Sequence, residues 1–70
     1  MAAAAVERRQ VKFELRAEPG STVYVAGTFN EWNPTQKRMR DPFRQGLYST
    51  TLLLPRGRYE YKFIVNGVWC

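Results

Sequence analysis

The sequence predicts an all-β domain, a sandwich or a barrel, on two observations. The first is a set of short segments in which apolar and polar residues alternate, as in residues 10–17, QVKFELRA. This period of two is the pattern of a half-buried strand. The second is a turn signal of Pro, Gly, Asn or Asp between the segments. Only the alanines near the start suggest a helix, and they are too few to hold one.

The expected strands follow one another with short connections. They are 10–18, 21–29, a short one near 37–40, 47–54, 58–65, and a strand that begins at 68. The connection at 19–21, Pro-Gly-Ser, is short enough for a hairpin, and a crossing to a second sheet is the alternative. Asn66-Gly67 lies between two valines, and this pair is the strongest short hairpin signal, which predicts a type I′ turn.

Size and composition indicate one globular domain. The chain has 70 residues, of which 44% are hydrophobic, and no stretch approaches the roughly 20 apolar residues of a membrane span. We expect a flexible N-terminal segment at 1–9 and a β domain at 10–70. The start lacks a basic residue ahead of its apolar run, which makes a poor signal peptide. The single cysteine, Cys70, indicates a reducing compartment, and we expect the cytoplasm.

The residues that catalysis requires are missing, so we expect no catalytic residues. The sequence has no histidine, which excludes a Ser-His-Asp triad. Its carboxylates mostly stand beside Lys or Arg on solvent faces rather than as a close pair. Cys70 has no candidate activating partner, and one cysteine without histidine makes a zinc site untenable. We therefore expect no enzyme, no metal site and no cofactor.

The Asn66-Gly67 turn fixes the register of its hairpin and so places Trp69. Val65 pairs with Val68, and one step back Ile64 stands opposite Trp69. Lys62 shares the face of Ile64, because side chains alternate along a strand. The residues expected on the opposite, core face are Tyr61, Phe63 and Val65. An indole beside an ammonium donor suits a sugar, whose C–H face stacks on the ring while its hydroxyls take hydrogen bonds.

A second tryptophan occurs in an unusually polar segment, AGTFNEWNP at 26–34. Trp32 is flanked by Asn30, Glu31, Asn33 and Pro34, none of which helps it to reach a core. If this loop folds toward Trp69, the two indoles form a pair of platforms for neighbouring sugar units. The alternative for either tryptophan alone is partly buried packing.

Two motifs resemble the glycogen-binding domains of carbohydrate-binding module family 48, found in AMP-activated protein kinase β subunits and in glycogen branching and debranching enzymes. They are VYVAGTFNEWNP at 23–34 and LYSTTLLLPRGRYEYKFIVNGVW at 47–69. The resemblance extends from Val11 to Trp69. It implies an immunoglobulin-like β-sandwich of the early-set type. It also implies that Trp32 and Trp69 stack on glucose units and that Lys62 hydrogen-bonds sugar hydroxyls. Asn33 is a weaker candidate contact.

The chain departs from this family after the second tryptophan. Family members continue with an Asp-Pro segment, an asparagine that contacts sugar, and a final strand. In this sequence Cys70 follows Trp69 directly, so we expect a sandwich without its last strand. The strand at 61–65, YKFIV, would then have an open edge guarded only by Lys62, and a homodimer through this edge is expected.

Three functions compete on the sequence. The first is a non-catalytic module that binds α-1,4-linked glucan, such as glycogen or a maltooligosaccharide, alongside a catalytic enzyme or a kinase subunit. The second is a protein-interaction or scaffold module of the same fold that has lost sugar binding. The third is a polyanion binder that uses the basic run KRMRDPFR at 37–44, within a chain of net charge +5. No RNA-binding signature accompanies that run, so nucleic acid is not an expected partner.

Overall fold

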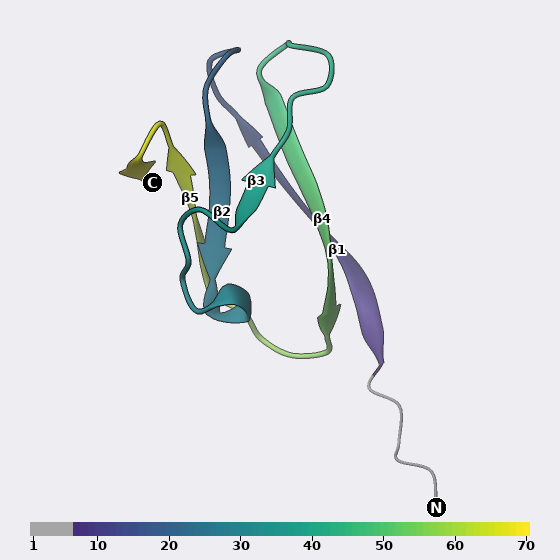
Figure 1. Ribbon diagram of the computed structural model, residues 1–70. Helices are drawn as coiled ribbons and strands as arrows, with labels where there is room; N and C mark the ends of the chain where they lie inside the picture. The colour runs from purple at the N-terminus through teal and green to yellow at the C-terminus, as the bar shows by residue number, and fades with distance from the viewer. Residues whose placement is uncertain (1–6) are drawn as a thin grey trace, which may run out of the picture.

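The computed structural model describes residues 7–70 and contains two antiparallel sheets, which confirms the predicted all-β, immunoglobulin-like sandwich (Figure 1). One sheet pairs β1 (Arg8–Arg16) with β4 (Leu47–Pro55). The other has the order β3 (Lys37–Met39), β2 (Val23–Gly27), β5 (Tyr61–Val65) and β6 (Val68–Trp69). A 3-10 turn, η1 (Thr28–Asn30), follows β2. Within this part of the chain no helix has the length and apolar character needed to cross a membrane.

The connection after β1 crosses between the sheets. β1 pairs with β4 over its whole length and not with β2, so the Pro-Gly-Ser segment at 19–21 is a crossing and not a hairpin. The first strand starts at Arg8, whereas the sequence placed the start of the β domain at residue 10. Residues 1–6 of the expected N-terminal segment lie outside the described part of the chain.

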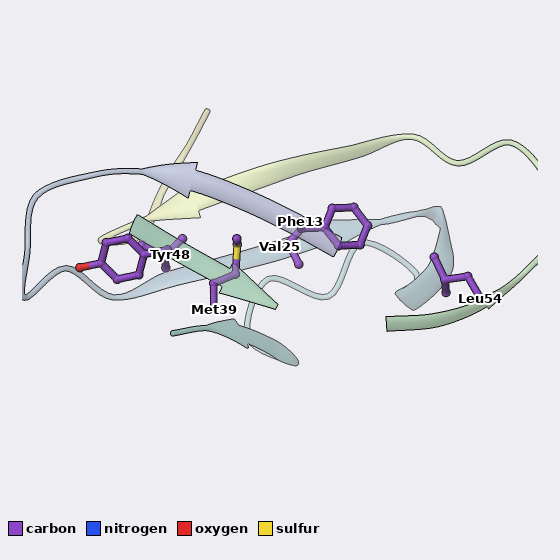
Figure 2. Packing of buried hydrophobic residues seen from close by; sticks show 6 residues of the cluster. Phe13, Val25, Met39, Tyr48 and Leu54 are labelled. Atoms are coloured by element: carbon purple, nitrogen blue, oxygen red, sulfur yellow. The ribbon is translucent and has the colours of Figure 1, made fainter. Parts of the chain in front are cut away.

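The core lies between the sheets and takes side chains from one face of each of the strands β1 to β5 (Figure 2). Its buried members are Phe13, Val23, Val25, Met39, Tyr48 and Leu54. Phe13, Val23 and Val25 occupy apolar positions of the alternating pattern, because side chains of a strand point to opposite faces in turn. The Tyr48 hydroxyl donates to the Glu18 carbonyl at 2.7 Å and accepts from the Ser21 amide at 2.9 Å, so its burial leaves no unpaired group.

Three strands are shorter than the sequence suggested. β2 covers Val23–Gly27 instead of 21–29, because the chain enters η1 at Thr28. β3 ends at Met39, and Arg40 instead makes an isolated bridge to Ser49 of β4, which joins the two sheets. β5 begins at Tyr61 rather than at residue 58, because Glu60 bonds to the turn after β2 and not to a strand. The Thr28 amide donates to the Glu60 carbonyl at 3.0 Å, and the Glu60 amide donates to the Thr28 hydroxyl at 3.3 Å.

The hairpin between β5 and β6 has the predicted register. Val65 pairs with Val68, and Ile64 pairs with Trp69. Asn66 and Gly67 have φ values of 50° and 83°, the left-handed pair that a type I′ turn requires. The Asn66 side-chain oxygen also accepts from the Thr22 amide at 2.9 Å, while the Asn66 amide donates to the Thr22 carbonyl at 2.8 Å. The turn is therefore fixed to the start of β2.

Candidate functional site

The outer face of the four-stranded sheet carries a row of side chains that crosses all four strands. Arg38 of β3 pairs with Tyr24 of β2, Tyr24 pairs with Ile64 of β5, and Ile64 pairs with Trp69 of β6. The neighbours of Tyr24 on β2 are fully buried in the core, so Tyr24 and its cross-strand partners point away from it. We call this set the outer row.

Trp32 meets Trp69 at the end of the outer row. The two ring centroids are 6.5 Å apart and the ring planes are inclined at 46°. Trp32 is 38% exposed and Trp69 is 45% exposed, so neither indole is withdrawn into the core. The structure thus brings together the two tryptophans that lie 37 positions apart in sequence.

The loop after η1 directs Trp32 back over the sheet by means of unusual backbone angles. Glu31 and Trp32 have φ values of 55° and 58°, in the left-handed region that non-glycine residues rarely occupy. The Trp32 amide donates to the Gly27 carbonyl at 2.9 Å, and the Asn33 amide donates to the Asn30 carbonyl at 3.1 Å. Such backbone strain persists only where the surroundings enforce it, and it concentrates at functional sites.

Gly27 allows this loop to begin where it does. Its backbone is extended, and a Cβ at this position would lie 2.3 Å from the Glu60 carbonyl oxygen and 2.6 Å from a ring carbon of Phe29. The Gly27 amide also donates to the Asn30 side-chain oxygen at 3.0 Å, which ties η1 to the end of β2. The glycine of the AGTFNEW motif is therefore needed for close packing at the root of the tryptophan loop.

Lys62 lies on the same sheet face, where it pairs with Ala26. Its side chain is exposed and has no ion pair among residues 7–70, so its three donors point to solvent. It is two residues from Ile64 along β5, which places it about 7 Å from the outer row. The strand register of the structure places Lys62 and Trp69 on the same face of the sheet, as the sequence predicted.

Asn33, unlike Lys62, already makes hydrogen bonds within the protein. Its side-chain oxygen accepts hydrogen bonds from the Thr35 amide at 3.0 Å and from the Thr35 hydroxyl at 3.2 Å. These bonds make Asn33 a stabiliser of the tryptophan loop and leave its amide nitrogen as the group that faces solvent. Its contact with sugar stays a prediction.

Ile64 differs from the other members of the predicted patch because it is buried. The sequence places it in one patch with Trp69 and Lys62, and it does lie on their face of the sheet, but only 3% of it is exposed although it points away from the core between the sheets. Its cross-strand neighbours Tyr24 and Trp69 flank it on both sides. We infer that these aromatic rings cover it, so Trp69 is a packing residue on its inner side and a free surface on its outer side.

Sequence reasoning did not include Tyr24 and Arg38 in the site. The alternation of Val23, Tyr24 and Val25 already indicated which way Tyr24 points. The pairing of β2 with β5 and β3, which aligns Tyr24 and Arg38 with the tryptophans, is a long-range contact without a local signal. Within residues 7–70 no group of three or more His, Cys, Asp or Glu side chains is placed to hold a metal ion.

A small immunoglobulin-like sandwich with paired, exposed tryptophans on one sheet face has the form of a carbohydrate-binding module. The comparison with protein families gives the same class. The model described as the glycogen recognition site of AMP-activated protein kinase matches residues 9–70, and the chain belongs to this family.

Similar proteins occur in plants and animals. Rice FLOURY ENDOSPERM 6, chloroplastic (Oryza sativa subsp. japonica), is 43% identical over 53 residues, which cover 76% of this chain and 10% of that protein. PTST homolog 2, chloroplastic, of Arabidopsis thaliana is 43% identical over 49 residues, or 70% of this chain and 9% of that protein. The human AMP-activated protein kinase subunit beta-2 is 36% identical over 56 residues, or 76% of this chain and 18% of that protein. The chain thus spans less than a fifth of each. No solved structure matches it.

Proposed function

We propose that this domain binds α-1,4-linked glucan, such as glycogen or a maltooligosaccharide, without acting on it chemically. The observation that carries the proposal is the pair Trp32 and Trp69, two exposed indoles 6.5 Å apart. Each indole offers an apolar surface to one glucose ring and loses little side-chain entropy on binding. The family to which the chain belongs supports the choice of glucan.

The inclination of the two rings supports an α-linked chain. Successive glucose units of an α-1,4-glucan are inclined to one another because the chain curls, whereas a β-1,4-glucan is flat. Indoles inclined at 46° match the curled chain better than a flat one. The loop bonds of Trp32 and the strand pairing of Trp69 fix the backbones of both residues before sugar binds, which reduces the ordering cost of binding.

Hydrogen bonds to the sugar hydroxyls come from groups at the side of the platforms. We assign Lys62 as the main donor, since its ammonium group is exposed on the same face and unpaired within residues 7–70. Asn33 contributes its amide nitrogen from the tryptophan loop, because its oxygen is already engaged. Neither group is a candidate for acid–base chemistry on the glycosidic bond, which needs two carboxyl groups across it.

Isothermal titration with maltoheptaose tests the proposal. The wild-type chain is expected to bind, and Trp69→Ala to weaken binding by tenfold or more, as loss of a stacking aromatic costs about 1–3 kcal/mol by analogy with base stacking. Phe43→Ala is the matched control, since Phe43 is the most exposed aromatic and lies in another loop. A thermal melt of each variant shows that it is folded.

The same titration can also contradict the proposal. Cellohexaose, with its flat β-linked chain, is expected to bind less tightly than maltoheptaose. A folded wild-type chain that binds neither sugar would support a scaffold role for the domain. Equal losses in Trp69→Ala and Phe43→Ala would remove the tryptophan pair from the site.

We further propose that the domain brings a partner to glucan. The relatives are much longer proteins, and one is a kinase subunit by name, which supports a catalytic enzyme or a kinase subunit as the partner. A second copy of the chain is another proposed partner, through the edge of β5. Pull-down from a lysate with the tagged chain, with and without glycogen, tests the first idea: a kinase or glucan-active enzyme is expected to be retained.

The proposed compartment is a reducing one, the cytoplasm, since the one cysteine of the sequence is free and exposed. Two relatives are chloroplastic by name, so the stroma is the compartment to test against it. Fractionation of the native cell with an antibody to the domain distinguishes the two. Recovery with plastids would overturn the cytoplasmic assignment.

A further inference from the structure

A basic hollow lies where β3 leads into the loop that follows it. Its volume is about 690 Å³ and it is open to solvent. Arg38, Arg40 and Arg44 line one part of it, and the crossing segment at 19–21 lines another. We call this the arginine hollow. The glucan platform described above makes no use of its three guanidinium groups.

The three arginines have no charged partners within residues 7–70. The only ion pairs in this part of the chain are Arg9 with Glu7 and Lys12 with Glu14, both on the first strand or next to it. Asp41 is the one carboxylate of the hollow, and its two oxygens accept the Gln45 and Gly46 amides at 3.0 and 2.7 Å. Three positive charges therefore face one carboxylate that is already occupied by backbone donors.

The outer row connects this hollow with the tryptophan pair. Arg38 is a member of both, because it lines the hollow and stands opposite Tyr24 on the sheet face. Three strand spacings separate Arg38 from Trp69 across the sheet, or about 14 Å. Tyr24, half-buried between them, gives a continuous surface along the row.

We propose that the site takes an α-glucan that carries a phosphate monoester, with the sugar on Trp32 and Trp69 and the phosphate in the arginine hollow. This inference rests on the proposed function. Guanidinium groups suit a phosphate group because their planar donors bond two of its oxygens at once. A glucan that follows the outer row from Trp69 over Tyr24 carries its substituents to Arg38.

The form of the hollow favours a phosphorylated sugar over a nucleic acid. Nucleic acid binding uses a basic track that follows many phosphates of a backbone. The arginines of the hollow instead form a local group at the end of a neutral row of Tyr24, Ile64 and Trp69. One phosphate next to a neutral sugar chain fits this distribution of charge.

The test compares two ligands of the same length by titration at low salt: maltoheptaose, and maltoheptaose with one 6-phosphate monoester. The phosphorylated form is expected to bind about tenfold tighter, which corresponds to two charge-assisted contacts at an exposed site. This advantage is expected to shrink as salt is raised, and inorganic phosphate is expected to compete with the phosphorylated form only. Equal affinities for the two ligands would overturn the inference and leave the proposed function intact.

Two charge-matched double variants sharpen the test. Arg40→Gln with Arg44→Gln, both in the hollow and outside the outer row, is expected to remove most of the phosphate advantage and to keep the affinity for neutral maltoheptaose, which also shows that the fold is retained. Arg56→Gln with Arg58→Gln, in the exposed turn between β4 and β5, is expected to keep the advantage. An equal loss of the phosphate advantage in both variants would indicate general attraction by net charge, and the arginine hollow would not be the phosphate site. Tighter binding of single-stranded RNA through Arg40 and Arg44 would overturn the ligand class. If the wild-type chain binds neither glucan, the proposed function itself has failed.

Discussion

At the scale of single residues, Trp32 shows how a polar loop presents an apolar side chain. Its left-handed backbone costs energy of order 1–3 kcal/mol, and the hydrogen bonds to Gly27 and within the loop hold it there. The gain is an indole fixed at 6.5 Å from Trp69 and accessible to a ligand. The polar neighbours of Trp32 serve this purpose, since they form the loop and do not contribute to a core.

The first prediction concerns Trp32→Ala. We expect glucan binding to weaken by at least tenfold, because one platform is lost, while the free energy of unfolding changes by no more than about 1 kcal/mol, as at exposed positions. Titration with maltoheptaose and urea unfolding measure the two effects. A loss of several kcal/mol in stability would mean that Trp32 is chiefly a packing residue.

The second prediction concerns the glycine at the root of the tryptophan loop. Gly27→Ala is expected to destabilise the fold by 2 kcal/mol or more, of the order that overpacking costs, because the new Cβ would meet backbone and ring atoms. Gly20→Ala is the control: its Cβ would meet nothing within 4 Å, and its φ of 85° alone should cost about 1 kcal/mol. Urea unfolding decides. Equal costs for the two variants would show that contact at Gly27 is unimportant.

At the scale of elements, the β5–β6 hairpin could be predicted from the sequence almost completely. Its turn is local: Asn66-Gly67 selects the type I′ geometry, and this geometry sets which residues face each other. The position of Trp69 opposite Ile64 and on the face of Lys62 follows directly. What the sequence could not give was the burial of Ile64, since the neighbouring strand that supplies Tyr24 is distant in the chain.

The same distinction between local signals and long-range contacts explains which ends of the other strands could be predicted. The strands predicted at 10–18 and 47–54 rest on local signals, and the structure has strands there, at Arg8–Arg16 and Leu47–Pro55. The shorter extents of β3 and β5 depend on the bridge of Arg40 to Ser49 and on the bond of Glu60 to Thr28, and both contacts join distant segments. The arginine hollow also depends on such a contact, between the crossing at 19–21 and the loop after β3.

The third prediction tests the hairpin as a unit. Asn66→Ala is expected to destabilise the chain by about 1–2 kcal/mol, because alanine tolerates the left-handed φ poorly and cannot accept the Thr22 amide. Glucan binding should weaken as well, since β6 positions Trp69 through this turn. Asn66→Asp, which keeps the accepting oxygen, is expected to retain most of both. Unchanged binding in Asn66→Ala would show that β6 holds its place without the turn.

At the scale of the whole molecule, the sandwich leaves an edge of its larger sheet open within residues 7–70. β6 covers β5 only at Ile64 and Val65, and beyond it the Cys70 amide donates to the Phe63 carbonyl. Tyr61, whose backbone groups point to this side, has no strand partner there. Next to this edge Tyr61 is 49% exposed and Val68 is 63% exposed. An apolar edge with free backbone groups is a template for another strand, and Lys62 is the only charged residue of β5.

The last prediction is that the 70-residue chain forms a symmetric dimer through this edge, and that dimer formation competes with glucan. A C2 arrangement satisfies the free groups of both copies at once. The edge adjoins Trp69, so a bound glucan and a second copy would occupy neighbouring surface. Sedimentation at several concentrations should show a dimer that maltoheptaose dissociates.

Val68→Lys is expected to block the dimer by placing a charge on the edge. Leu53→Lys, a substitution at a similarly exposed position on β4, should leave the dimer intact. A monomer at hundreds of micromolar, with the Tyr61 amide protected from hydrogen exchange, would contradict the prediction, because protection without a partner means that the edge is covered within one chain.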